Sequence, residues 1–281
     1  MRDKTAYIIK PPSKFSLNFN ELWLYRELFY FFTWRDVKVK YKQTVLGFLW
    51  AVLQPLLMMM VFVVFFSKAL KIPTDNIPPP VFYFSGLLLW NLFSTGLTSS
   101  AQSMVANSNM IKKIYFPRLI IPLSGILVAL FDFLMALIVF LGIIIYYQVS
   151  MPDFEVQSSI FLFLPLGLII TLVSVTGLGC ILASLNVKYR DFRYIIPFLL
   201  QILLFVTPVI YPVTMFDNIP YLKYVLALNP MTGAVILVRS AFVNGSVDWI
   251  IIGISITTAI ILLFLGIYTF RKMEAYFADI A

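Results

Sequence analysis

Residues 119–147 of this chain read LIIPLSGILVALFDFLMALIVFLGIIIYY, a run with a single charged side chain, Asp132. About 20 apolar residues in a helix cross the hydrocarbon core of a bilayer, so a run of this length predicts a membrane-spanning helix. The whole composition agrees with this interpretation. Of the 281 residues, 61% are hydrophobic and 12% are charged, which is more apolar side chain than a soluble domain buries.

Further apolar stretches lie on both sides of this run. They predict an all-α integral membrane protein with six transmembrane helices, an N-terminal amphipathic interface helix and a re-entrant helical hairpin between spans five and six. The chain then divides into an N-terminal segment (1–43), a transmembrane domain (44–270) and a C-terminal tail (271–281). The spans are expected near Thr44–Ser67, Val81–Ala106, Leu119–Tyr147, Ser159–Asn186, Ile195–Tyr211 and Asp248–Phe270.

The distribution of Lys and Arg predicts the orientation, because basic residues near span ends favour the cytoplasmic side. With both termini in the cytoplasm, the inner segments hold 17 of the 21 basic residues: nine before the first span, three at 112–118, three at 188–193 and two at 271–272. These residues lie between the apolar stretches and form no single patch. The net charge of +8 therefore indicates membrane topology, and we expect no nucleic acid partner.

The segment between the fifth and sixth spans, residues 212–247, is harder to place. It contains two apolar pieces, Tyr221–Leu228 and Met231–Val243, separated by Asn229 and Pro230. Proline removes a backbone donor and disfavours helix at the residue before it. The break predicts a bent hairpin that enters the membrane from the outer side. A seventh span is the weaker alternative, because it would move the two basic residues after the last span to the outer side.

The residues before the first span predict a helix on the membrane surface. The segment from Asn18 to Trp34 contains seven aromatic residues from Trp23 onward, and aromatic rings with polar edges favour the headgroup region. Such a helix serves either as an anchor alone or also in admitting a substrate.

Catalytic and metal-binding residues are not expected. The chain has no His, a single Cys and no Gly-Lys pair, which excludes a disulfide framework, the usual zinc sites and the phosphate-binding loop of an ATPase. Gly177-Leu178-Gly179 lacks the third glycine of a dinucleotide site and predicts helix packing. Asp132 is the one ionisable residue deep in a span, and it either has a function or bonds to a neighbouring helix.

Three segments occur in order at the predicted cytoplasmic positions: RDVKVKYKQTVLGFLW at 35–50, followed by QPL at 54–56, then NSNMIKKIYFPR at 107–118 and NVKYRD at 186–191. Together they resemble the permease subunits of polysaccharide-exporting ABC transporters, the family of the O-antigen, capsule and teichoic-acid exporters. The resemblance runs from about residue 34 to residue 272. It implies a homodimer of this chain in the bacterial inner membrane, with ATP and Mg bound on two separate ATP-binding subunits and no cofactor in this chain.

The resemblance also implies the substrate, a lipid-linked polysaccharide with O-antigen as the first choice. A teichoic-acid or capsule exporter is the alternative within the family. A membrane-embedded glycan-modifying enzyme or a secondary carrier is the alternative outside it, and dependence on an ATP-binding partner distinguishes these classes.

In this family the loop between spans two and three forms a coupling helix that docks into the ATPase, which places that helix at about residues 107–117. Apolar residues at helical spacing suit a groove, and two lysines suit an acidic rim. The alternative is a plain basic loop. The expected coupling residues are Asn107, Asn109, Ile111, Lys112, Lys113, Ile114, Tyr115 and Phe116.

Sugar polymers stack on aromatic faces, and two predicted spans carry aromatic stripes at helical spacing. The alternative is that these rings pack helices or face lipid. The expected channel-lining residues are Tyr83, Trp90 and Phe93 in span two and Phe198, Gln201 and Phe205, beside Tyr194, in span five.

The resemblance assigns an outer gate to the hairpin, and with it Pro212, Asn229 and Pro230. A basic cluster beside the surface helix would attract the pyrophosphate of a lipid-linked substrate. Charge that only sets topology explains this cluster equally well. Its members are Arg35, Lys38, Lys40 and Lys42.

Overall fold

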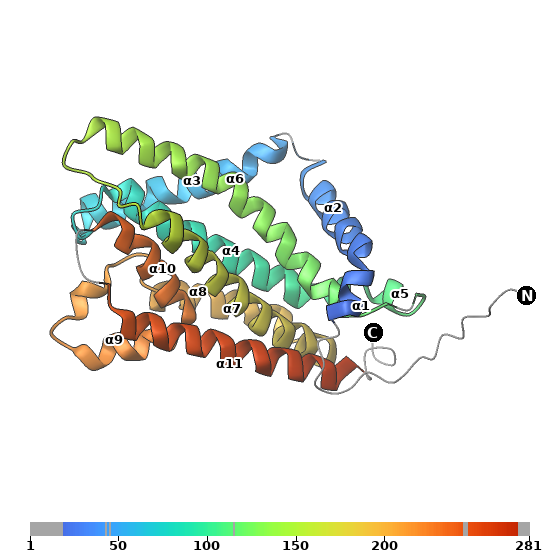
Figure 1. The fold of residues 1–281 in the computed structure, drawn as a ribbon. Helices are drawn as coiled ribbons and strands as arrows, with labels where there is room; N and C mark the ends of the chain where they lie inside the picture. Colours follow the sequence, from blue (N-terminus) through green and yellow to red (C-terminus); the bar gives the residue numbers. More distant parts are fainter. Residues whose placement is uncertain (1–18, 43, 45, 115, 244–246, 275–281) are drawn as a thin grey trace, which may run out of the picture.

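The computed structural model describes residues 19–42, 44, 46–114, 116–243 and 247–274. All regular structure in these residues is helical and none is a strand, which confirms the predicted all-α class. Figure 1 shows long helices packed side by side, with α1 and α5 at one end of the bundle and α9 and α10 towards the other.

In the described part of the chain, five helical segments are long and apolar enough to cross a membrane, so the chain is a multi-pass membrane protein. They coincide with the first, second, third, fourth and sixth predicted spans. The second is the most buried of the five and packs on the third, the fourth and the first. The segments are η1 (Gly47–Leu49) with α3 (Trp50–Phe62) and the π-helix η2 (Val63–Ala69), α4 (Pro79–Ala106), α6 (Ile120–Ser150), α7 (Ile160–Lys188) and α11 (Trp249–Met273).

The fifth predicted span is shorter than expected. α8 (Phe192–Val206) has 15 residues, fewer than the roughly 20 that cross a bilayer core. It ends where Thr207 adopts an extended backbone, because the following Pro208 disfavours the helical conformation at that residue. The remaining residues of the predicted span, up to Tyr211, are not helical.

The segment after α8 contains the bend that the sequence predicts. The short turn η3 (Val213–Phe216) leads to α9 (Pro220–Ala227) and α10 (Pro230–Arg239), and η4 (Ser240–Phe242) follows. The helix axis bends by 105° between Tyr221–Ala227 and Pro230–Phe242, across Leu228 and Asn229. Asn229 starts α10 by accepting a hydrogen bond from the backbone N–H of Met231 at 3.1 Å, as an N-terminal cap does. α10 is buried against α7, α11 and α4.

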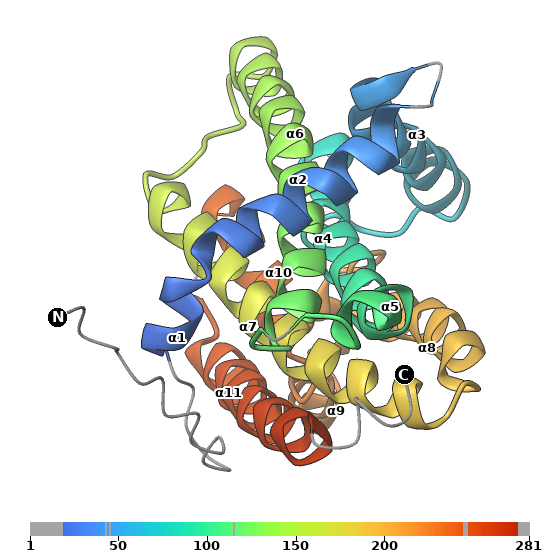
Figure 2. The same cartoon turned by 90° about the vertical axis from the view of Figure 1, so that its right-hand side faces the viewer.

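The N-terminal helices lie across one end of the bundle (Figure 2). α1 (Phe19–Leu24) and α2 (Arg26–Lys42) are separated by a break at Tyr25, and α2 packs on α6. Asn18, where the surface helix was predicted to begin, lies outside the described residues. The one-turn helix α5 (Ser108–Ile111) lies at the same end.

Close helix contacts explain both glycines of Gly177-Leu178-Gly179, which the sequence predicted for packing. A Cβ atom on Gly179 would lie 2.5 Å from Oγ of Ser100 in α4. α7 and α11 cross where a Cβ atom on Gly266 would lie 2.1 Å from the carbonyl oxygen of Gly177. Only glycine at positions 177 and 266 permits the two backbones to approach this closely. Small residues commonly allow such close contact between membrane helices.

Candidate functional site

The predicted coupling segment, residues 107–117, is anchored in its own chain. Ile111 is 7% exposed and lies in an apolar cluster with Phe116, Phe32 of α2 and Phe270 of α11. Burial of Ile111 contradicts the prediction that its side chain contacts a partner protein. The segment therefore packs on two elements that are distant in sequence, one before the first span and one at the end of the last.

The outward part of this segment is small, basic and partly apolar. Ile114 is 60% exposed, and Asn109, Lys112 and Lys113 are also exposed. Tyr115 lies outside the described residues. Ile111, Ile114 and Tyr115 were predicted to fill a groove. Of the two that the structure describes, Ile111 is buried, and Ile114 is exposed and can contact a partner.

Asn107 joins the coupling segment to α2. Its Oδ1 accepts a hydrogen bond from Arg35 Nη2 at 2.9 Å, and its Nδ2 donates to the carbonyl of Ser103 at 2.9 Å. Arg35 Nε also donates to Asp36 Oδ1 at 2.8 Å, and the guanidinium lies 5.0 Å from the ring centroid of Phe32. Arg35, predicted to attract substrate, is thus engaged in contacts within the chain.

Asp132 joins α6 to α2. Its carboxylate accepts hydrogen bonds from Lys40 Nζ and from the hydroxyl of Tyr41. The structure thus shows the second of the two alternatives for Asp132, a bond to a neighbouring helix. Burial and the hydrogen bond to Asp132 raise the pKa of Tyr41, which keeps the hydroxyl protonated as a donor.

The basic cluster of α2 therefore separates into two kinds of residue. Arg35 and Lys40 dock the helix on its own chain, whereas Lys38 and Lys42 are exposed. The Lys38 ammonium lies 5.2 Å from the ring centroid of Trp34. Lys40 is exposed as well, but its charge is paired with Asp132, whereas none of the ion pairs among the described residues involves Lys38 or Lys42. These two lysines therefore offer surface charge to a substrate or a lipid headgroup.

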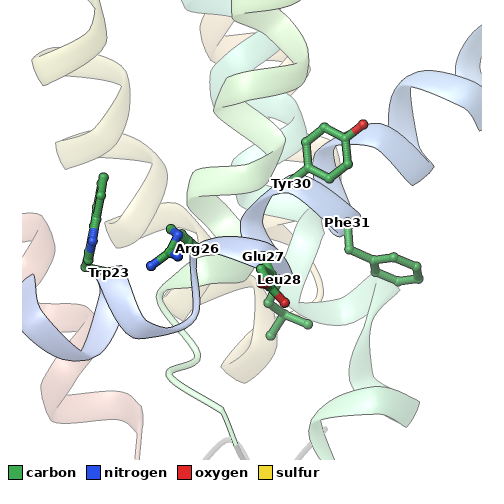
Figure 3. Close-up of a pocket in the computed structure, with 6 residues that line it drawn as sticks. All are labelled: Trp23, Arg26, Glu27, Leu28, Tyr30 and Phe31. Atoms are coloured by element: carbon green, nitrogen blue, oxygen red, sulfur yellow. The ribbon is translucent and has the colours of Figure 1, made fainter.

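An open hollow of about 790 Å³ lies at the junction of α1 and α2, and Figure 3 shows its lining side chains. The lining is mainly aromatic and aliphatic, with one charge of each sign. Amphipathic rings and long basic side chains of this kind favour the region where lipid tails meet headgroups. The lining residues are Trp23, Arg26, Glu27, Leu28, Tyr30 and Phe31.

The two aromatic stripes have opposite environments. Tyr83, Trp90 and Phe93 are buried among helices of the same chain, which argues against the channel-lining role predicted for them. Their burial follows from the central position of α4 in the bundle. The stripe on α8 is exposed along its length, and its residues are Tyr194, Phe198, Gln201 and Phe205.

The predicted gate residues lie where α10 meets the end of α8. Asn229 Nδ2 donates a hydrogen bond to Thr207 Oγ1 at 2.7 Å, and both Pro212 and Pro230 are buried. Arg239, which was not among the predicted site residues, is buried at the other end of α10. The available signal was a lone arginine inside an apolar run, which is costly at membrane depth unless it has partners.

Most of these elements lie within the part of the chain that matches a known family. The sequence profile described as ABC-2 type transporter matches residues 27–243, from α2 to the end of η4. The chain belongs to the ABC-2 type transporter family. This result confirms the family resemblance drawn from the three segments that the sequence places, by prediction, on the cytoplasmic side. ABC-2 permeases are transport components, and enzymatic activity is not their role.

Curated proteins similar to this ABC-2 permease cover most of its length. The O-antigen export system permease protein RfbA of Klebsiella pneumoniae is 31% identical, over 88% of this chain and 92% of the relative. The protein of the same name from Myxococcus xanthus is 33% identical, over 79% and 82%. The polysialic acid transport protein KpsM of Escherichia coli is 26% identical, over 85% and 91%.

Proposed function

We propose that this chain is the permease subunit of an ATP-driven exporter that moves a lipid-linked polysaccharide across the bacterial inner membrane, with O-antigen as the first-choice substrate. The observation that carries the proposal is the coupling segment. It presents Ile114 and two lysines outward, while Asn107 and Ile111 fix it to α2 and to the bundle. A segment built in this way transmits the movement of an attached ATPase to helices at the membrane surface.

The proposed topology has both termini in the cytoplasm and six crossings. The fifth crossing consists of α8 with the non-helical residues that follow it, and α9 and α10 form a hairpin that enters from the outer side. The positive-inside rule supports this arrangement. In this proposed topology Lys112 and Lys113 lie on the cytoplasmic side, where ATP-binding subunits, with ATP and Mg, would attach.

The proposed channel lies between two copies of the chain, with the exposed face of α8 directed into it. Stacking on Phe198 and Phe205 would hold a glycan weakly enough to let it slide, and Gln201 would supply a hydrogen bond. Access for the lipid-linked end is proposed at the hollow between α1 and α2, which Arg26 lines, and Lys38 and Lys42 further along α2 add positive charge that attracts a pyrophosphate.

A capsular polysaccharide is the second candidate substrate. It is supported by the similarity to the polysialic acid transport protein named above, and an aromatic stripe suits neutral and acidic glycans alike. The α8 face carries no described charge between Tyr194 and Val206, so it does not distinguish the two polymers.

Reconstitution tests the proposal. The chain is placed in lipid vesicles with its ATP-binding partner, and transport of a lipid-linked O-antigen is compared with that of an acidic capsular glycan. We expect ATP-dependent transport of at least one, and none with a partner that binds but cannot hydrolyse ATP. Transport that needs no partner, or no transport of either glycan, would refute the proposed function.

A further inference from the structure

The last turn of α10 buries a cation that none of the proposed roles uses. Arg239 is 7% exposed, and within the described residues its guanidinium donates to backbone carbonyls alone. Nη1 donates to Pro208 at 2.5 Å and, at the limit of hydrogen bonding, to Tyr211 at 3.5 Å. Nη2 donates to Val209 at 2.7 Å and to Phe82 at 3.0 Å. None of the ion pairs among the described residues involves Arg239.

These carbonyls belong to two different elements. Pro208, Val209 and Tyr211 form the non-helical segment after α8, whereas Phe82 lies in the first turn of α4. The Phe82 ring also lies against the guanidinium, with its centroid 3.5 Å from Cζ. One side chain of α10 thus joins the outer ends of α8 and α4.

The neighbouring sequence leaves space for the guanidinium. A Cβ atom on Gly86, one turn after Phe82, would lie 2.8 Å from Nη2 of Arg239, and 3.2 Å and 3.3 Å from Cγ1 and Cα of Val209. Since real Cβ atoms do not approach so closely, a larger residue at position 86 would displace the guanidinium from its carbonyls.

α10 is joined to the end of α8 at both of its ends. Asn229, at its start, donates to Thr207, and Arg239, at its end, donates to the carbonyls at 208 and 209. Those carbonyls follow directly after the C-terminal end of α8, where the helix dipole is negative and favours a cation. Moving α10 away would break these bonds together and leave a buried charge without compensation, which costs far more than the loss of one hydrogen bond.

We propose that Arg239 is a positioning residue that clamps the outer hairpin closed over the end of α8. The inference rests on the proposed function, in which this hairpin is the outer gate. In the resting protein the clamp seals the outer end of the pathway. Opening requires residues 207–211 to separate from the guanidinium.

The test uses the complete chain, assembled with its ATP-binding partner in vesicles without ATP. Arg239→Met removes the donors, and Arg239→Lys keeps the charge but loses the planar fork of donors. Gly86→Ala crowds the guanidinium and the neighbouring Val209 without changing either residue. Gly142→Ala and Gly253→Ala are matched controls, because a Cβ atom at either position meets nothing within 4 Å. Amide hydrogen exchange at residues 207–216 and 230–239 reports local opening, and release of a small trapped dye reports sealing.

We expect Arg239→Met and Gly86→Ala to accelerate exchange in both segments by at least about tenfold, as for a local opening that has become more frequent. Amide exchange in α6 should stay unchanged, and vesicles with either variant should release dye. The exchange rate and dye release of Arg239→Lys should lie between those of these variants and the native chain. The glycine controls should match the native chain.

Unchanged exchange in folded variants would overturn the clamp. Faster exchange in vesicles that stay sealed would overturn the gating role. If Arg239→Met does not fold, Gly86→Ala and Arg239→Lys decide the question. Failure of the native complex to export any glycan refutes the proposed function instead, and the exchange measurement then still reports whether Arg239 holds the hairpin.

Discussion

Arg35 Nη2 and Asn107 Oδ1 lie 2.9 Å apart, although the two residues are 72 positions apart in the sequence. Asn107 is the residue at which α4 ends and α5 begins. This bond therefore connects α2 directly to the segment proposed to contact the ATPase. A displacement of α5 reaches α2 without passing through the length of any span.

Removing this bond should weaken the coupling of ATP hydrolysis to export. Arg35→Ala and Asn107→Ala each delete one partner, and we expect each to lower export several-fold while ATP hydrolysis continues. Both substitutions remove the same bond. The loss of export in the double variant should therefore be smaller than the sum of the two single losses, by an interaction free energy of about 0.5–1.5 kcal/mol. Export and hydrolysis are measured in the same vesicles.

Arg190→Ala is the control for this pair. Arg190 is an exposed arginine between α7 and α8, outside the residues to which the proposed transport roles are assigned. Full additivity of the Arg35 and Asn107 effects would show that the two side chains act independently.

Two neighbouring isoleucines of the coupling segment should respond differently to a charge. Ile111→Asp places a carboxylate in the apolar cluster and should lower the unfolding temperature strongly, since burying an unpaired charge costs several kcal/mol. Ile114→Asp changes an exposed side chain and should leave the unfolding temperature nearly unchanged, while reducing copurification of the ATP-binding subunit. Thermal unfolding in detergent and affinity copurification separate the effects. A stable Ile111→Asp protein that loses its partner would reverse the assignment.

The carboxylate of Asp132 should stabilise the docking of α2. Asp132→Asn removes the charge that Lys40 and Tyr41 contact, and we expect a loss of about 1–2 kcal/mol, since the Lys40 side chain is 40% exposed and solvent screens the pair. Faster trypsin cleavage in α2 and a lower unfolding temperature report the loss. Asp217→Asn, which breaks an exposed pair with Lys223, should have almost no effect on either.

The Tyr41 hydroxyl gives this docking a defined pH dependence. Its pKa in the folded chain is raised above the ordinary value of 10.0, so the folded state binds the proton more tightly than the unfolded state does. The stabilisation is complete below pH 10 and is lost as the pH rises beyond that value. Trypsin cleavage in α2 should therefore be constant from pH 7 to 9.5 in the native chain. A steady increase over that range would contradict this account.

The features of the fold that depend on a single physical criterion were predictable from the sequence. Bilayer thickness sets the length of an apolar run, so the five long helices were predictable, and Pro230 predicted the bend before α10. Periodicity shows which residues share a helix face but not which neighbour covers that face. Trp90 of α4 and Phe205 of α8 have similar surroundings in sequence, and only the packing buries the first and exposes the second.

Long-range polar contacts were beyond prediction for the same reason. Asp132 was recognisable as costly, but its partners come from α2, about 90 positions earlier. Arg239 contacts backbone carbonyls, and a carbonyl has no residue identity that a sequence could show.

The contrast between the two stripes supplies the last prediction. Trp90→Ala should destabilise the fold by roughly 3–5 kcal/mol, because it leaves a cavity in the core. Phe205→Ala removes an exposed ring, so stability should change little, whereas the export rate of a long glycan should fall roughly two- to tenfold, the equivalent of about 0.5–1.5 kcal/mol of aromatic contact. Phe161→Ala on α7, whose ring is 85% exposed, is the control for loss of an exposed aromatic residue. Equal export by the Phe205 and Phe161 variants would remove α8 from the channel and leave its aromatic face to lipid or to the second copy of the chain.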